Sequence, residues 1–147
     1  MLENMKVKIV NRSDNALPEY STSHSAGMDI KAFLSDSITI RSGEITLIPT
    51  GLYIELPDGY EAQIRPRSGL ALKHGITILN APGTIDADYR GEIGIILINH
   101  SPSDFVINNG DRICQMIVTE YTKVEWLSAN ELNESKRGDG GFGHTGI

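Results

Sequence analysis

The hydrophobic positions of this chain fall in short runs that are separated by turn residues. Leu52, Ile54 and Leu56 recur at every second position, which indicates a strand with one buried face. A Pro-Asp-Gly turn follows at 57–59, and residues 60–65 are typical of a returning strand, so we predict a hairpin.

Further strands are predicted from other apolar runs. They cover residues 7–10, 76–79, 93–98 and 113–118, and the last of them follows a turn at 108–111. The run 93–98 is apolar at nearly every position, so we expect both of its faces to be buried. Strands at this density predict an all-β sandwich or barrel.

Helical signals are few. Residues 70–73 could form one turn, and residues 128–132 could form a short helix capped by Ser128. The last stretch is glycine-rich and polar without a core-forming pattern, so we expect it to be mobile. We therefore predict a β domain at residues 1–134 and a flexible tail at residues 135–147.

Composition and charge narrow the class of protein. The 147 residues suit one globular domain, and no run approaches the ~20 apolar residues of a membrane helix. The net charge of −6 argues against non-specific nucleic-acid binding and favours a compact ligand if phosphate is bound. Residues 1–6 lack an apolar signal core, and Cys114, the single cysteine, has no disulfide partner in the chain. We expect a soluble cytoplasmic protein with no membrane or nucleic-acid partner.

Two segments in the first half of the chain carry candidate chemistry. In residues 26–32, Asp29 lies among small and apolar residues, although one surface Asp in a strand is an equally simple reading. In residues 65–70, Arg67 offers a forked donor set beside unpaired N–H groups of a predicted helix start, which favours an anion. The alternative is a loop with Ser68 as helix cap. A nucleophilic Ser68 is disfavoured because no His or Lys base is signalled near it.

The most informative segment is residues 80–91. It lies between two apolar strands, so we expect a hairpin or its mouth, with a sharp turn at Pro82-Gly83. Asp86 and Asp88 are predicted to share one strand face, where either could activate water or lie near a metal. A polar hairpin tip without function is the alternative.

Two segments near the C-terminus complete the set. Gln115 lies in an otherwise apolar strand and needs hydrogen-bond partners, while Cys114 reads as a small core residue. In the tail, glycines separate Arg137, a phosphate-type donor, from Phe142, which can stack on a planar base. The tail is not a Walker A loop, because the Gly-Lys-Ser/Thr ending is missing. The scattered histidines make no zinc-type spacing with Cys114.

In this order and spacing the five segments resemble the five motifs of the dUTPases, over residues 26–146. The most specific parts are residues 66–70, 85–91 and 140–146. The resemblance implies a jelly-roll-like β-barrel that forms a homotrimer with exchange of C-terminal arms and three shared active sites. It also implies the reaction, hydrolysis of dUTP to dUMP and pyrophosphate, which keeps uracil out of DNA and supplies dUMP for thymidylate synthesis.

The resemblance assigns a role to each candidate residue. Asp86 would be the general base that directs water at the α-phosphorus, Asp29 would support the catalytic centre, and Tyr89 would form the floor under the sugar. The uracil and sugar pocket would be lined by Asn80, Gly83, Thr84, Ile85 and Gly94. The phosphates would be held by Arg67, Ser68, Gly69 and Gln115. The tail would contribute Arg137, Phe142, Gly143, His144 and Thr145, with Phe142 stacked on uracil. Mg²⁺ would be the cofactor, held by substrate phosphates and water rather than by protein ligands.

Two rival functions are carried forward. One is dCTP deaminase, an enzyme of the same fold, which is disfavoured because Asp86 and Tyr89 follow the dUTPase pattern. The other is a dUTPase-like protein whose main role is to contact another protein.

Overall fold

The structure, a computed structural model, describes residues 4–146. The outer ends of the two predicted regions, residues 1–3 and 147, lie outside the described residues. The described part is all-β, as predicted, with a single short helix among its strands. In chain order the elements are β1 (Lys8–Asn11), β2 (Met28–Lys31), β3 (Ile38–Ile40), β4 (Ile45–Pro49), β5 (Leu52–Glu55), β6 (Tyr60–Arg65), α1 (Ser68–His74), β7 (Ile76–Ile78), β8 (Gly83–Ile85), β9 (Gly94–Asn99), β10 (Phe105–Ile107) and β11 (Arg112–Glu120).

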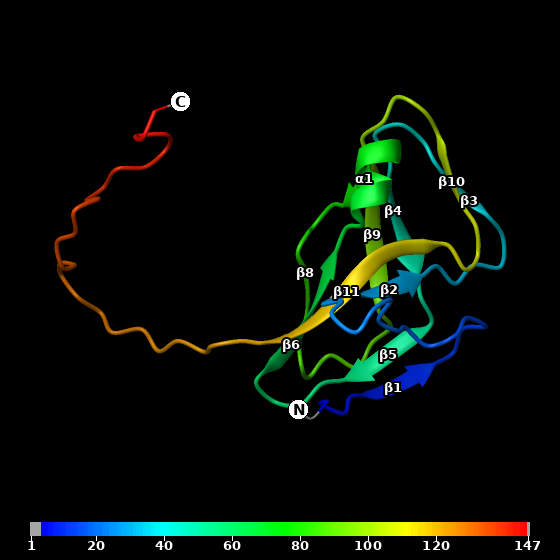
Figure 1. Cartoon of the computed structure of the whole chain (residues 1–147), viewed down its shortest axis with the longest axis horizontal. Coiled ribbons are helices and arrows are strands. Elements are labelled where there is room, and N and C mark those ends of the chain that lie inside the picture. The colour runs from blue at the N-terminus through cyan, green and yellow to red at the C-terminus, as the bar shows by residue number, and fades with distance from the viewer. Residues whose placement is uncertain (1–3, 147) are drawn as a thin grey trace.

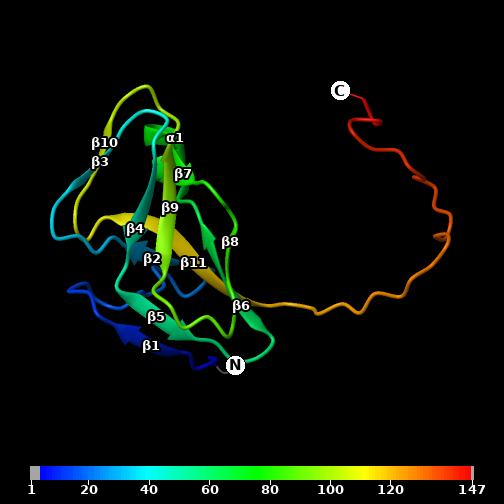
Figure 2. The same cartoon turned by 180° about the vertical axis from the view of Figure 1, so that it is seen from behind.

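The strands pair in four small antiparallel sheets (Figures 1 and 2). Their orders are β1-β5, β10-β3, β2-β11-β6-β8 and β4-β9-β7. Within residues 4–146 no ladder joins one sheet to the next, so the strands do not form the closed hydrogen-bonded barrel that the resemblance implied. The sheets instead enclose one core by packing their buried faces together.

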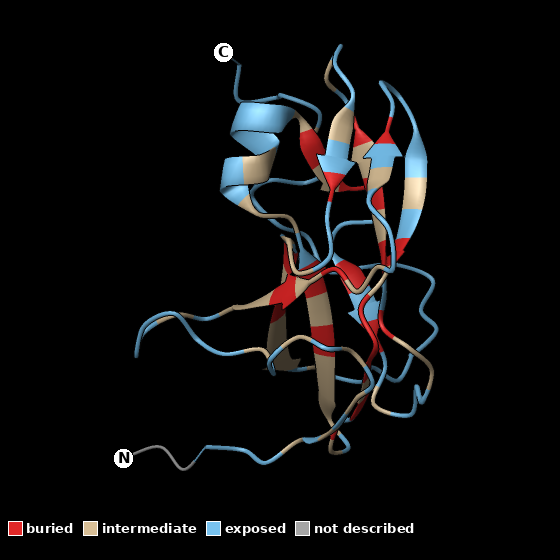
Figure 3. Cartoon of the chain, turned by 90° about the vertical axis from the view of Figure 1, so that its right-hand side faces the viewer, coloured by how far each residue is buried: buried red, intermediate tan, exposed pale blue. Residues whose placement is uncertain are grey.

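The core is built mainly from isoleucines at alternate strand positions. Figure 3 shows the buried residues concentrated on the strands, whereas α1 has no buried residue. In β9, Ile95 and Leu97 are fully buried, whereas Ile96 and Ile98 are only half-buried. The prediction that both faces of this strand are buried is therefore confirmed for one face alone. The other face is covered only in part by this chain.

The predicted hairpin between residues 52–56 and 60–65 is wrong in its pairing. Both strands exist, and a turn joins them, with the Tyr60 N–H donating to the Pro57 carbonyl at 3.3 Å. However, β5 pairs with β1, and β6 pairs with β11 and β8. Alternation of apolar residues identifies a strand but not its partner, and distant segments of the chain supply the partners here.

The C-terminal arm, residues 121–146, contains no helix or strand. The predicted helix at 128–132 is therefore wrong. An isolated helix this short is unstable without a packing surface, and Leu127 and Leu132 are more than nine-tenths exposed. Figures 1 and 2 show the arm leaving the end of β11 and extending away from the sheets. No helix in the described part of the chain is long and apolar enough to cross a membrane.

Candidate active site

The first half of the site is a charged cluster at one end of the four-stranded sheet. Asp29 on β2 forms an ion pair with Arg67, whose Nε lies 3.1 Å from one carboxylate oxygen, and Arg112 Nη1 lies 3.7 Å from the other. Arg67 also donates from Nη1 to the Arg112 carbonyl at 3.0 Å. Two fixed contacts therefore hold the Arg67 guanidinium over the sheet end. Sequence reasoning gave Asp29 and Arg67 roles but missed Arg112, whose only signal was its place directly after the 108–111 turn.

Gln115 belongs to the same cluster. It lies opposite Asp29 and Arg65 in the β2-β11-β6 register, and its side-chain amide donates to the Pro66 carbonyl at 3.0 Å. The prediction that this amide needs a partner is confirmed. Gly27 packs against it so closely that an added Cβ would lie 2.5 Å from the Gln115 Oε1 atom. The hydrogen bond from Gln115 to the Pro66 carbonyl therefore links β11 to the segment that carries Arg67.

The segment after Pro66 forms α1. Its N-cap is Arg67, with φ −93° and ψ 130° and without a side-chain cap hydrogen bond, so the alternative of Ser68 as helix cap is wrong. The first bond of the helix runs from the Ala71 N–H to the Arg67 carbonyl at 3.0 Å. The N–H groups of Ser68 and Gly69 precede that bond, and an added Cβ at Gly69 would meet nothing within 4 Å. Backbone donors beside Arg67 are thus open to a ligand.

The second half of the site is a pocket of about 60 Å³ between β8 and the β7-β9 pair. Its walls include every residue that the resemblance assigned to the uracil and sugar pocket: Asn80, Gly83, Thr84, Ile85 and Gly94. Apolar side chains from neighbouring strands complete it. Nucleotide-sized sites usually enclose several hundred Å³, so this pocket is one part of a larger site.

The segment between β7 and β9 forms a long hairpin, as predicted, because these two strands pair directly. Inside it, β8 crosses to pair with β6 in the four-stranded sheet. Asp86 and Asp88 do not share a strand face, which corrects the prediction. Both are exposed and follow the end of β8 in a turn, where the Tyr89 N–H donates to the Asp86 carbonyl at 3.1 Å.

Tyr89 is held beside this turn. Its hydroxyl donates to the Glu92 carbonyl at 2.8 Å, and its ring lies over Gly91, where an added Cβ would collide with the ring atoms. The ring remains 45% exposed. Gly91 is therefore a site residue that sequence reasoning did not separate from the motif around it.

The two halves lie toward opposite edges of the four-stranded sheet. Asp29 on β2 and Thr84 on β8 are three strand spacings apart across the four-stranded sheet, which is about 14 Å. The tail residues are further still, because the arm leads away from the sheets in Figure 1. Within the described tail, Arg137 Nε donates to the Gly140 carbonyl at 2.8 Å, and Phe142 is fully exposed with φ 52°. Gly143, His144 and Thr145 are exposed as well.

No group of three or more His, Cys, Asp or Glu side chains that could hold a metal ion occurs within residues 4–146.

Cys114 is fully buried, and burial raises the pKa of its thiol above the ordinary value, with a smaller contribution from the nearby Asp29 charge. A hollow of about 370 Å³ beside the first cluster includes Asp29 and Arg112 but is otherwise lined mostly by residues 13–21. This larger hollow shares no lining residue with the 60 Å³ pocket beside β8.

Comparison with known proteins identifies the family. The family profile described as dUTPase matches residues 13–146. The deoxyuridine 5'-triphosphate nucleotidohydrolase of Finegoldia magna is 58% identical over 142 residues, covering 97% of this chain and 99% of that protein. The enzyme of the same name from Rickettsia felis is 59% identical over 143 residues and is covered to 97% in both chains.

Solved structures share the fold. A variant of the Staphylococcus bacteriophage 80alpha dUTPase with dUpNHpp superposes with a TM-score of 0.88 at 24% identity, over 98% of this chain and all of that one. A variant of the dUTPase from phage phi11 of S. aureus, whose structure describes a structural Mg(II) ion, gives a TM-score of 0.79 at 23% identity over 88% of this chain and all of that one. With a profile match and relatives of this identity across nearly its whole length, the chain belongs to the dUTPase family.

Proposed function

We propose that this chain hydrolyses dUTP to dUMP and pyrophosphate. The observation that carries the proposal is the identity of 58% to a deoxyuridine 5'-triphosphate nucleotidohydrolase over 97% of the chain. The grouping of five residues of the β8 hairpin, Asn80, Gly83, Thr84, Ile85 and Gly94, around one hollow also supports it. The activity would keep uracil out of DNA and supply dUMP for thymidylate synthesis.

Asp86 is the proposed general base. Its carboxylate is exposed, and no side-chain hydrogen bond or ion pair to it is found among the described residues. It can therefore accept a hydrogen bond from a water molecule without first breaking a contact in the protein. Displacement at phosphorus needs alignment and charge compensation more than covalent help, so one carboxylate that orients and deprotonates water suffices.

The pyrimidine end is proposed to occupy the small pocket beside β8. Asn80 and the backbone of residues 83–85 offer amide donors and carbonyl acceptors, which suit the N3–H of uracil between its two carbonyls. A base with the wrong edge would leave these groups unpaired, and such mismatches can lower kcat/KM by ~10⁴. Tyr89 is the proposed floor under the sugar, where its fixed ring leaves no room for a 2′-hydroxyl.

The phosphates are proposed to bind at the first cluster. Arg67 is held in place by Asp29, and Gln115 with the backbone at Ser68 and Gly69 adds uncharged donors. Since no carboxylate cluster suits a protein-bound ion within residues 4–146, we place Mg²⁺ on the triphosphate and water. When bound there, Mg²⁺ neutralises phosphate charge.

We propose a homotrimer in which other copies of the chain complete each site. The placement of the two halves toward opposite edges of the four-stranded sheet supports shared sites. The outer face of the β4-β9-β7 sheet supports a subunit contact, because Ile45 and Leu47 are more than half exposed and lie opposite Ile98 and Ile96. Of residues 1–134, proposed as the β domain of each subunit, the part after Glu120 belongs to the arm.

The tail, residues 135–147, is the proposed lid over a neighbouring site. Phe142 would stack on uracil, Arg137 and Thr145 would hold the terminal phosphate, and the backbone at Gly143 and His144 would line the phosphate chain. The support is the full exposure of Phe142 together with the reach of the arm away from its own subunit.

The test is pyrophosphate release from dUTP, dTTP, dCTP and UTP, each with and without Mg²⁺. We expect strong preference for dUTP. The Asp86→Asn variant should bind a non-hydrolysable dUTP analogue normally and lose ~10²- to 10⁴-fold in kcat. Ammonia release from dCTP without pyrophosphate release from dUTP would instead identify a deaminase. Absence of turnover on every nucleotide would favour a binding role.

A further inference from the structure

Asp86 and Tyr89 lie at the two ends of the turn that follows β8. Its backbone is closed by one hydrogen bond, from the Tyr89 N–H to the Asp86 carbonyl at 3.1 Å. Both side chains with a proposed catalytic or binding role lie at its two ends, and both are exposed. A turn of this kind needs side-chain contacts if its ends are to stay fixed relative to each other.

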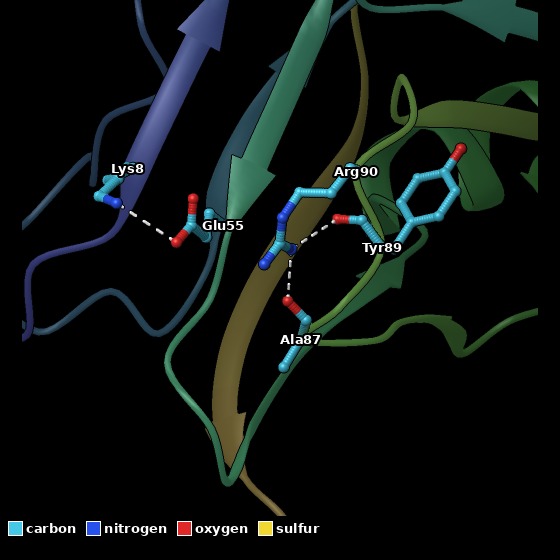
Figure 4. Close-up of polar contacts among 5 residues, drawn as sticks. All are labelled: Lys8, Glu55, Ala87, Tyr89 and Arg90. Atoms are coloured by element: carbon cyan, nitrogen blue, oxygen red, sulfur yellow. Dashed lines mark hydrogen bonds and ion pairs between the residues drawn. The ribbon is translucent and has the colours of Figure 1, made fainter.

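Arg90 supplies such contacts. Its Nη1 atom donates to the Ala87 carbonyl at 2.7 Å and to the Tyr89 carbonyl at 3.1 Å, as Figure 4 shows. The first carbonyl lies inside the turn and the second lies just after it. The guanidinium therefore bridges the turn from its own C-terminal side and opposes any change of the angle between the two peptide planes.

The surroundings of Arg90 leave its guanidinium available for this bridge. Glu55 lines the same groove, about 270 Å³ in volume, between β1, β5 and the turn. Its carboxylate is paired with Lys8 Nζ on β1 at 3.3 Å (Figure 4). Arg12, which also lines the groove, lies over the Tyr53 ring, 4.8 Å from its centroid. Glu55 and Arg12 thus each have a contact other than Arg90.

A second set of contacts joins the end of the turn to the sheets. The Tyr89 hydroxyl donates to the Glu92 carbonyl at 2.8 Å, and Glu92 Oε1 accepts from the Gly51 N–H at 2.8 Å. The next residue, Ile93, donates from its N–H to the Leu52 carbonyl at 2.8 Å. These contacts fix the C-terminal side of the turn to β5 and to Gly51 before it. The bond from Arg90 to the Ala87 carbonyl then restrains the N-terminal side of the turn as well.

We propose that Arg90 is a positioning residue for the reaction: its bridge between the Ala87 and Tyr89 carbonyls fixes the orientation of Asp86 and of the Tyr89 ring. The inference rests on the proposed dUTP hydrolysis and deepens it. Arg90 itself touches neither the water nor the substrate. Because a displacement of about 1 Å at a reacting group can lower the rate 10²-fold, loss of the bridge acts on kcat more than on binding.

The experiment compares Arg90→Ala and Arg90→Lys with the unchanged protein and with Arg41→Ala. Arg41 is a matched control, because its exposed side chain has no hydrogen bond or ion pair within residues 4–146. Each protein is assayed for kcat and KM on dUTP, for the ratio of kcat/KM between dUTP and UTP, and for Tm.

For Arg90→Ala we expect kcat on dUTP to fall about 10- to 100-fold while KM changes less than about 3-fold, with a reduced preference for dUTP over UTP. Its Tm should stay within about 2 °C of the unchanged protein, since both carbonyls remain accessible to water. The Lys variant should recover part of kcat, because an ammonium group can still bond one carbonyl. Arg41→Ala should leave all values unchanged.

Three results would overturn the inference. If Arg90→Ala matches an active unchanged protein in kcat and in nucleotide preference, Arg90 has no positioning role and the proposed dUTP hydrolysis stands. If Arg90→Ala and Arg90→Lys lose Tm and activity in parallel, the residue serves stability alone. If the unchanged protein does not hydrolyse dUTP, the proposed function fails first and the inference falls with it.

Discussion

Replacement of Gly91 by alanine should alter nucleotide preference by displacing the Tyr89 ring. The backbone permits the change, because Gly91 is not among the glycines with positive φ. The obstacle is the Tyr89 ring, whose Cζ and Cε2 atoms would lie 2.5 and 2.9 Å from the new Cβ. These separations are too short for carbon atoms, so either the backbone or the ring must move.

The magnitudes decide which of them moves. Keeping the ring in place would force the surrounding backbone to shift, and overpacking of this kind costs about 1–3 kcal/mol. Swinging the ring outward breaks the bond from its hydroxyl to the Glu92 carbonyl, a loss of about 0.5–1.5 kcal/mol. Part of the packing of the ring is lost in addition, although Tyr89 is already 45% exposed. The hydroxyl bond costs less than a backbone shift, so the ring should swing out, with a fall in Tm of up to about 6 °C.

The assay is kcat/KM on dUTP and on UTP for Gly91→Ala. If Tyr89 forms the sugar floor, its displacement should lower the preference for dUTP by about 10-fold or more, equivalent to about 1.4 kcal/mol. Tyr89→Phe is the matched control, because it removes the hydroxyl bond and keeps the ring over Gly91. That control should retain most of the preference.

A double-mutant cycle isolates the contact. In a Tyr89→Ala background the added methyl group has no ring to displace, so Gly91→Ala should then have no further effect on preference. An unchanged ratio of dUTP to UTP activity in the single Gly91→Ala variant would refute the reasoning. So would an equal effect of Gly91→Ala with and without the Tyr89 ring.

Three other results are expected. A chain truncated before Arg137 should lose at least ~10-fold in dUTP turnover with its Tm unchanged within about 2 °C, because the removed residues are exposed; a fall in Tm by light-scattering-controlled calorimetry would contradict this. Asn99→Ala should lower the free energy of unfolding by about 2–4 kcal/mol in urea, since this fully buried amide bonds the Ile40 and Ser103 carbonyls and the Ser101 N–H; a loss below 1 kcal/mol would count against it. Burial raises the pKa of the Cys114 thiol, so above about pH 8.5 the thiol loses its proton in the unfolded chain but keeps it in the folded protein. The free energy of unfolding should therefore fall above this pH by up to about 1.4 kcal/mol per pH unit. The same slope in a Cys114→Ala variant would disprove this cause.

Local patterns in the sequence predicted what local physics determines. Alternating apolar residues located β5 and β6, and the isolated polar residue Gln115 was correctly expected to need a partner. The strand partners were not predictable in the same way. The pairing of β5 with β1 joins residues more than 40 positions apart, such as Lys8 and Glu55. Alternation of apolar residues within one strand does not indicate which distant strand it pairs with.

The site shows the same division. The five assigned pocket residues lie within residues 80–94, so one hairpin carries them all, and Ile64 of β6 completes the wall. Arg112 was missed because its contact with Asp29 depends on the register between β11 and β2, which includes an irregularity just after Arg112. The helix expected at 128–132 failed for the opposite reason. Ser128 supplied a local capping signal, yet no surface within residues 4–146 covers Leu132.

The extension of the arm away from its own sheets has a genetic consequence if the proposed trimer forms. In that trimer a site takes Asp86 from one copy and its tail from another, so a defect in either copy spoils only the sites to which that copy contributes the damaged part. An Asp86→Asn chain and a chain without its tail would each be inactive alone. Mixed and reassembled, they would complement each other, because some sites would combine an intact carboxylate with an intact tail.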